Sequence, residues 1–220
     1  MVTQKAVCIQ RRASGQGEGV KKVGIMGGTF NPIHLGHLLL AENARSAFGL
    51  DEVWFLPSGY SYMKSQEEME DGAVRLHMTE LACRDNPYFR VSSLEVDRGG
   101  YTYTADTLCQ LVAENPDTSF FFIVGADNLF TMESWKEPEV IFQKAGILAA
   151  VREGCDEGKL QEQAAHLKDR FGARVFLIPA GTIEISSSEI RARIQSGRSI
   201  RYMVHEKVRR YIEKNGLYKG

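Results

Sequence analysis

The sequence predicts an α/β fold with a doubly wound parallel sheet. From about residue 22, apolar runs of strand length alternate with longer stretches that have the helical period. The run SFFFIV at 119–124 is apolar at every position, which is typical of a strand buried on both faces of a parallel sheet. In such a sheet, ligands bind beyond the carboxyl ends of the strands, where the strand order reverses. A site is therefore expected in the loops that follow residues 26, 56, 124 and 178.

The expected elements follow one another in this alternating order. VGIM at 23–26 is the first strand, and the helix near 36–48 that comes next is closed by Gly49. The later strands are the apolar runs VWFL (53–56), FRVSSLEV (89–96), SFFFIV (119–124), ILAAV (147–151) and RVFLI (174–178). Stretches with the helical period predict helices near 72–84, 104–114, 158–171, 187–196 and 204–214.

The composition is that of an ordinary globular protein. Of the 220 residues, 43% are hydrophobic and 25% are charged, which allows a substantial core. Twenty-seven basic against 28 acidic residues give a net charge of −1, which argues against a surface for nucleic acid or acidic membranes. No run approaches the roughly 18 apolar residues of a membrane helix, and the N-terminal region lacks the apolar core of a signal peptide. A cytoplasmic protein is expected, and a homo-oligomer stays an open alternative.

The chain is expected to divide into a tail and one domain. Residues 1–21 are polar and glycine-rich, as in ASGQGEG, and are expected to be a disordered tail, whereas 22–220 form the domain. The cysteines are far apart and form no C-x-x-C pair, so buried reduced thiols are favoured over distant disulfides. These residues are Cys8, Cys83, Cys109 and Cys155.

The stretch KVGIMGGTFNPIHLGHL, at 22–38, combines features that suit a phosphate. Gly27 and Gly28 follow the first strand, and they let a ligand approach main-chain N–H groups without meeting a Cβ. The next helix is expected to begin close to His34 or Leu35, and a helix N-terminus offers free donors and a partial positive charge.

The two histidines of this stretch are three residues apart. At this spacing, His34 and His37 would share one face of the first helical turn, and Gly36 between them leaves room for a ligand against the backbone. A glycine turn with two incidental histidines is the alternative. A zinc site is weakly supported, because helical metal motifs space their histidines four apart and no third ligand is evident.

A second candidate phosphate element is ISSSEIRARI at 185–194. Ser186 and Glu189 have the spacing of a capping box, so an ordinary capped helix is one interpretation. A helix N-terminus with hydroxyl groups, and with Arg191 one turn in, is also suited to bind phosphate.

Both stretches resemble motifs of the nucleotidylyltransferase superfamily. GGTFNPIHLGH resembles its H-x-G-H signature, and ISSSEIR resembles its I-S-S-T-x-I-R motif, with Ser188 in place of threonine. The resemblance implies a Rossmann-like nucleotidylyltransferase fold in which the histidines and the preceding backbone bind the phosphates of a nucleoside triphosphate. The ATP-binding residues that it implies are Gly27, Gly28, Thr29, Phe30, Gly36, Gly125, Asp127, Ile185, Ser186 and Ser187.

Three other segments resemble the nicotinate-nucleotide adenylyltransferase family. They are YTYTADTL (101–108), IVGADNLFTMESW (123–135) and the ending NGLY (215–218), so the resemblance spans about residues 22–218. It implies that Tyr103 and Thr104 meet the carboxylate of nicotinate mononucleotide and that Trp135 stacks on the pyridine ring. The alternatives are Thr104 as a plain helix N-cap, Trp135 as a core or surface aromatic and Asp127 as a helix cap.

One segment departs from this family. Where the family has P-P-H-K or P-P-H-R after the second strand, this chain has Ser61, Tyr62, Met63 and Lys64. Lys64 keeps the cation and is expected on the phosphates, against the alternative of a solvated lysine beside acidic EEMED. Without the prolines and the histidine, this loop is expected to be less preorganised than in the family.

The resemblance implies transfer of AMP from ATP to nicotinate mononucleotide, which gives deamido-NAD and pyrophosphate in NAD biosynthesis. The acceptor phosphate would attack in line, with Mg²⁺ on the triphosphate and no metal held by the protein. The catalytic residues that it implies are His34, His37, Lys64 and Arg191. Nicotinamide mononucleotide or phosphopantetheine as acceptor, and a non-catalytic nucleotide-binding module, are the rivals.

Overall fold

The computed structural model describes residues 19–59, 69–151, 155–179 and 184–219. The expectations for most of the tail, for Cys8 and for the segment Ser61–Lys64 fall outside the described residues. The first strand begins at Lys21, the last residue that the sequence assigned to the tail.

The core of the fold is one sheet of six strands in the order β3-β2-β1-β4-β5-β6, and every neighbouring pair is parallel. This confirms the predicted doubly wound parallel sheet. In the middle strands β1 and β4, residues 23–26 and 120–124 are buried without a break, as the apolar runs predicted. The strands are β1 (Lys21–Gly28), β2 (Glu52–Pro57), β3 (Phe89–Val91), β4 (Thr118–Gly125), β5 (Ala145–Val151) and β6 (Val175–Pro179).

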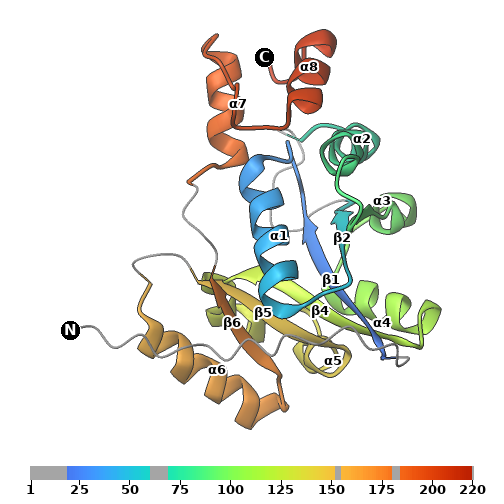
Figure 1. Cartoon of the computed structure of the whole chain (residues 1–220), viewed down its shortest axis with the longest axis vertical. Coiled ribbons are helices and arrows are strands. Elements are labelled where there is room, and N and C mark those ends of the chain that lie inside the picture. The colour runs from blue at the N-terminus through green and yellow to red at the C-terminus, as the bar shows by residue number, and fades with distance from the viewer. Residues whose placement is uncertain (1–18, 60–68, 152–154, 180–183, 220) are drawn as a thin grey trace.

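Helices cover both faces of the sheet (Figure 1). One buried hydrophobic cluster joins the sheet to α1, α2, α7 and α8, and a second joins it to α4, α5 and α6. The α-helices are α1 (Leu35–Phe48), α2 (Gly72–Cys83), α3 (Leu94–Arg98), α4 (Thr104–Glu114), α5 (Pro138–Lys144), α6 (Glu157–Phe171), α7 (Ser187–Gln195) and α8 (Glu206–Asn215). The short 3₁₀ helices η2 (Ala126–Phe130) and η3 (Met132–Ser134) follow β4.

The predicted strand at 89–96 was too long. Pairing with β2 stops after Val91, where the Ser92 N–H donates to the carbonyl of Phe55 at 2.9 Å. The Ser92 hydroxyl then accepts from the Leu94 N–H at 3.3 Å, and the chain turns into α3. Helix α5 was not predicted, because its seven residues form only two turns.

The expectation for the cysteines is confirmed in part. Cys83 is a buried free thiol, and burial raises its pKa to about 12. Cys155 is half-buried, and Cys109 is exposed, so the prediction of a buried thiol was wrong for Cys109. None of the described helices is both long enough and apolar enough to cross a membrane.

The strand order places the expected site. After β1 the chain builds β2 and β3 on one side, and it then returns to lay β4 on the other side of β1. The loops that leave the carboxyl ends of β1 and β4 therefore diverge, and such a divergence leaves a crevice. The strand order therefore reverses between β1 and β4, and the sequence predicts a ligand site at such a reversal.

Candidate active site

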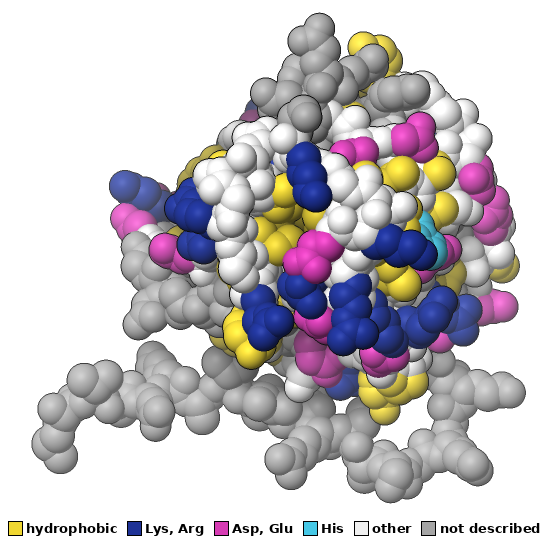
Figure 2. Space-filling view, turned by 90° about the horizontal axis from the view of Figure 1, so that it is seen from above, with side chains coloured by type: hydrophobic (Ala, Val, Ile, Leu, Met, Phe, Trp, Pro, Cys, Tyr) yellow, Lys and Arg dark blue, Asp and Glu magenta, His cyan; other side chains and the backbone are white. Residues whose placement is uncertain are grey.

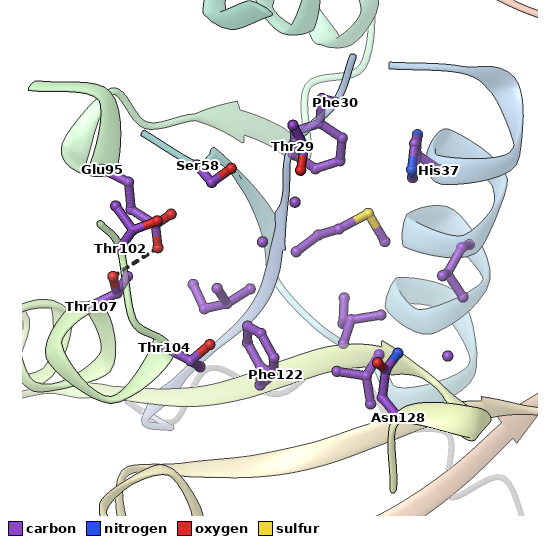
Figure 3. A pocket seen from close by; sticks show the side chains of 18 of the residues that line it. Thr29, Phe30, His37, Ser58, Glu95, Thr102, Thr104, Thr107, Phe122 and Asn128 are labelled. Carbon is purple, nitrogen blue, oxygen red and sulfur yellow. Dashed lines mark hydrogen bonds between the residues drawn. The ribbon is translucent and has the colours of Figure 1, made fainter. Parts of the chain in front are cut away.

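A cavity of about 460 Å³ lies at this divergence, a volume suited to a small-molecule ligand. Figure 3 shows Phe30 and His37 on one side of the cavity and Ser58, Glu95, Thr102 and Thr107 on the other. The predicted site residues that line it are Gly27, Gly28, Thr29, Phe30, His37, Thr104, Gly125, Trp135 and Ser187. The structure therefore brings residues from five distant segments of the sequence to one cavity.

The loop after β1 is held by three side chains from two other segments, helix α7 and the C-terminal region. The Ser187 hydroxyl donates to the Pro32 carbonyl at 2.9 Å, and Arg191 Nη1 donates to the Asn31 carbonyl at 2.9 Å. Near the C-terminus, the Tyr218 hydroxyl donates to Asn31 Oδ1 at 2.8 Å, and burial raises the pKa of this hydroxyl, which keeps it protonated as a donor. These contacts fix the loop as a preformed cradle.

Phe30 occupies a strained position in this loop. Its φ of 47° lies in the left-handed region, which a residue with a side chain rarely adopts. Its ring packs edge-on against the His37 ring, with centroids 5.0 Å apart. It also packs at a tilt against the Phe55 ring, with centroids 5.9 Å apart. Such strain is typical of functional sites, where the surroundings impose an unusual backbone.

The two histidines share one face of α1, as their spacing predicted. Helix α1 begins at Leu35 with His34 as its N-cap, and the two rings stack with centroids 3.6 Å apart. The backbone N–H of His34 donates to His37 Nδ1 at 3.2 Å. Because Nδ1 accepts this bond, the ring proton of His37 is on Nε2, where it can be donated to a ligand.

His34 differs from His37 in its surroundings. It is 7% exposed, and burial lowers its pKa to about 4, so the ring is neutral near pH 7. His37 lines the cavity, whereas His34 does not. A Cβ on Gly36 would lie 3.1 Å from His34 Nδ1, so this glycine makes room for the His34 ring; Gly36 itself does not line the cavity.

The start of α7 confirms half of the predicted capping box. Ser186 is the N-cap, and its hydroxyl accepts from the Glu189 N–H at 3.1 Å. The Glu189 carboxylate does not reach back, because Arg193 Nε donates to it at 2.9 Å. Ile185 packs against the hydrophobic core, and Ser187 lines the cavity, whereas Ser186 and Arg191 do not.

The opposite wall of the cavity is polar and was largely missed from the sequence. Glu95 is 8% exposed, and its Oε1 accepts from the Thr107 hydroxyl at 2.7 Å. Burial raises the pKa of Glu95 above its usual value, although the hydrogen bond from Thr107 and the charge of Arg98 oppose this. Tyr103 is the N-cap of α4 and Thr104 its first residue, so the alternative of Thr104 as the cap was wrong.

Trp135 closes the cavity beside β4. Its ring meets Phe122 edge-on with centroids 6.2 Å apart. Its indole Nε1 and the Ser58 hydroxyl are buried, and neither has a hydrogen-bond partner among the described residues. Buried polar atoms in a cavity wall that lack a protein partner are groups that a ligand can satisfy.

The residues after β4 are only partly as expected. Gly125 lines the cavity and is the N-cap of η2, so the alternative of Asp127 as a cap was wrong. Asp127 is exposed and does not belong to the cavity wall, whereas its neighbour Asn128 does. Lys64 lies outside the described residues.

The sequence held weak signals for the residues that were missed. Ser58 follows β2 at the binding edge of the sheet, where a site was expected, but a single serine has no motif. Glu95 was assigned to a strand, so its place in the cavity wall could not be anticipated. Asn128 lies next to the residue that the family motif indicated.

The buried position of Glu95 predicts a pH-dependent stability. Because its folded pKa is raised, its protonated form favours folding below the unfolded pKa of about 4.3, and this contribution is lost as pH rises through the folded pKa. Glu95→Gln keeps an acceptor for Thr107, so the Tm of the variant minus that of the unaltered protein should increase with pH. Thermal unfolding of both proteins between about pH 4 and pH 8 measures this, and a constant difference would contradict it.

The surface near the site carries both positively and negatively charged side chains. Figure 2, which looks onto the end of the molecule with α2, α7 and α8, shows Lys and Arg side chains with Asp and Glu among them. Arg209 pairs with Glu206 at 2.7 Å, and Lys207 with Asp85 at 2.7 Å. Within the described ranges, no three His, Cys, Asp or Glu side chains gather as metal ligands do.

Known proteins resemble this chain over most of its length. Residues 25–193 match the family described as Cytidylyltransferase-like. The probable nicotinate-nucleotide adenylyltransferase of Lachnoclostridium phytofermentans is 47% identical over 90% of this chain and 100% of its own length. That of Thermoanaerobacter sp. is 40% identical over 90% of this chain and 94% of its own length.

A solved structure agrees in fold. The nicotinic acid mononucleotide adenylyltransferase of Plasmodium falciparum, complexed with NaAD, superposes with a TM-score of 0.72 at 23% identity, over 90% of this chain and 97% of the other. The match to the sequence motifs, the placement of their residues around one cavity and the identity to these relatives agree with one another. The chain belongs to the nicotinate-nucleotide adenylyltransferase family.

Proposed function

We propose that this protein transfers AMP from ATP to nicotinate mononucleotide and releases pyrophosphate and deamido-NAD. The observation that carries the proposal is the two-sided cavity between β1 and β4. One side presents Phe30 and His37, and the other presents the polar residues Ser58, Glu95, Thr102 and Thr107 (Figure 3). The glycine turn, Ser187 and Trp135 also line the cavity. A phosphate-binding end and an end for an aromatic acid are what this reaction needs.

The triphosphate is assigned to the side of His37. The positive ends of α1 and α7, the main chain of the glycine turn and the His37 Nε2–H are suited to phosphate oxygens. Ser186, Ser187 and Arg191 are assigned to the β and γ phosphates, and Lys64 is assigned there on the family pattern. His34, which is neutral and buried, is assigned to support the His37 ring.

Nicotinate mononucleotide is assigned to the side of α4. The first turn of α4 offers main-chain N–H groups at Tyr103 and Thr104 for the carboxylate, and Lys136 Nζ lies 4.3 Å from the Tyr103 ring centroid. Trp135 offers an aromatic face for the pyridine ring. Gly125 is assigned to ATP beside β4; Asp127 is assigned to a ribose on the family pattern alone.

The reaction needs positioning more than acid–base help. An oxygen of the acceptor phosphate forms a bond to the α-phosphorus of ATP, and the bond from that phosphorus to the bridging oxygen breaks, with its electron pair leaving on pyrophosphate. The acceptor phosphate is ionised at neutral pH, so no strong base is required. The His37 Nε2–H stabilises negative charge on the transferring group.

We assign Mg²⁺ to the triphosphate rather than to the protein. Its ligands would be phosphate oxygens and water, because the described residues contain no cluster of metal-ligating side chains. When bound, it neutralises charge on the leaving pyrophosphate. We also assign the protein to the cytoplasm on the basis of its sequence features.

The test is a coupled pyrophosphate-release assay with ATP and each candidate acceptor. Turnover with nicotinate mononucleotide, at a higher kcat/KM than with nicotinamide mononucleotide or phosphopantetheine, is expected. Preference for one of the other acceptors would overturn the assignment of the acceptor. Absence of turnover with all three would favour the non-catalytic nucleotide-binding module.

Trp135→Ala should raise the KM for nicotinate mononucleotide about tenfold, because a stacked base contributes roughly 1–3 kcal/mol. The KM for ATP should change little, since the indole belongs to the other side of the cavity. Steady-state kinetics with each substrate varied in turn measures both constants. Trp54→Phe is the matched control, because Trp54 donates to Glu52 at 2.8 Å and does not belong to the cavity wall. An equal effect on both KM values would count against stacking.

A further inference from the structure

A buried arginine lies directly behind the cavity wall. Arg75 of α2 is 1% exposed, and its guanidinium donates to three backbone carbonyls from three different segments. Nη1 donates to Thr29 at 2.7 Å, Nη2 to Gly59 at 2.9 Å and Nε to Glu70 at 2.9 Å. Each of the three guanidinium nitrogens therefore donates to a backbone carbonyl that precedes α2 in the sequence.

Two of these three carbonyls belong to loops at the binding edge of the sheet. Thr29 follows β1, Gly59 follows β2, and Glu70 precedes α2. Thr29 lines the cavity, and so does Ser58, the neighbour of Gly59. A single side chain thus joins the loop assigned to ATP to the loop after β2.

The contact to Thr29 fixes the direction of a peptide group. In a trans peptide the C=O and the next N–H point to opposite sides. Because the Thr29 carbonyl points to Arg75, the N–H of Phe30 points away from it. Arg75 therefore holds the peptide group between Thr29 and Phe30 in one orientation, at the start of the cradle after β1.

The chemistry of arginine suits this role better than that of lysine. A guanidinium stays charged when buried and holds its donors in a fixed planar fork, whereas an ammonium group presents its donors from one atom. Lysine cannot reach three carbonyls placed around such a fork. A buried cation whose bonds serve packing alone could be replaced by an apolar residue at little cost to activity.

We propose that Arg75 is a positioning residue of the adenylyl-transfer site. It orients the loop after β1 so that this loop can bind the phosphates, and it holds this loop in a fixed position relative to the loop after β2. The proposal rests on the proposed function for the identity of the nucleotide. Arg75 itself does not touch the substrate, because it does not belong to the cavity wall.

The test compares Arg75→Lys and Arg75→Met with the control Thr79→Val. Thr79 is fully buried one turn along the same helix, and its hydroxyl donates to the Arg75 carbonyl at 2.8 Å without reaching either loop. Each variant is studied at a temperature where circular dichroism shows that it is folded. The readouts are kcat for pyrophosphate release and the affinity for a non-hydrolysable ATP analogue by calorimetry.

We expect Arg75→Lys to lower kcat and the affinity for the analogue about tenfold each, and Arg75→Met to lower both further. Thr79→Val should lower Tm and leave both within about twofold of the unaltered protein. Should Arg75→Met fail to fold, Arg75→Lys alone decides the question, because it keeps the charge and most of the volume.

Two outcomes would overturn the proposal. In the first, folded Arg75→Lys retains the kcat and the analogue affinity of the unaltered protein. In the second, Thr79→Val loses as much as Arg75→Lys at an equal loss of Tm. If the unaltered protein binds the analogue but turns over none of the acceptors, the proposed function fails, and the affinities still decide the role of Arg75. If it binds no analogue, both proposals fail.

Discussion

Replacing His37 by alanine should lower kcat about 100-fold or more while the fold stays intact. The ring lines the cavity, and the backbone N–H of His34 occupies its Nδ1, so Nε2 carries the proton toward the ligand. A donor held in this way is oriented before the reaction, and the loss of one such donor to a transition-state oxygen typically costs about 10²–10³ in kcat. Steady-state turnover with ATP and nicotinate mononucleotide measures the effect.

His77→Ala is the matched control for this prediction. His77 lies on α2 with a half-exposed side chain that faces Glu80 at 3.5 Å, and it is absent from the cavity wall. Its removal should leave kcat within about twofold. Unchanged turnover of folded His37→Ala would remove His37 from the mechanism. A loss of kcat accompanied by loss of circular-dichroism signal would instead assign His37 a structural role.

The fold could be predicted because its strands are apolar on both faces. An unbroken run such as that of β4 has one stable environment, the middle of a parallel sheet, and the strand order then follows from few alternatives. The predicted strand at 89–96 was too long because the apolar residues of this run suit a short strand followed by a helix as well as one long strand. Only the pairing of β3 with β2, which ends at Val91, decides between them.

The site was predictable where its residues are adjacent in sequence. The spacing of His34 and His37 fixes their shared face of α1, and three serines before a helical run mark the start of α7. Ser58 and Glu95 could not be found in this way, because they meet only when α3 packs against β2. Burial, which separates neutral His34 from His37, is likewise a property of the packed molecule.

Arg191→Ala should lower kcat/KM for ATP roughly 10- to 100-fold, since a hydrogen bond to a charged group contributes about 1.5–3 kcal/mol. Arg191 Nη1 donates to the Asn31 carbonyl at 2.9 Å, so it anchors the loop after β1 to α7. The same guanidinium is assigned to the phosphates that leave, where a planar fork with several donors can serve both partners. The variant therefore loses a positive charge near the leaving pyrophosphate and the contact that holds the loop after β1. Initial rates with ATP varied at saturating nicotinate mononucleotide measure the combined effect of both losses.

Arg193→Ala separates this effect from a general loss of charge on α7. Arg193 lies two residues further along the same helix and pairs with Glu189 at the surface at 2.9 Å, where an ion pair contributes at most about 1 kcal/mol of stability. It should leave kcat/KM for ATP within about twofold. Equal losses in both variants would mean that kcat/KM for ATP depends only on the net charge of α7. Because only Arg191 contacts Asn31, a loss confined to Arg191→Ala would show that the use of ATP depends on the loop that leads from β1 into α1, the helix that carries His37.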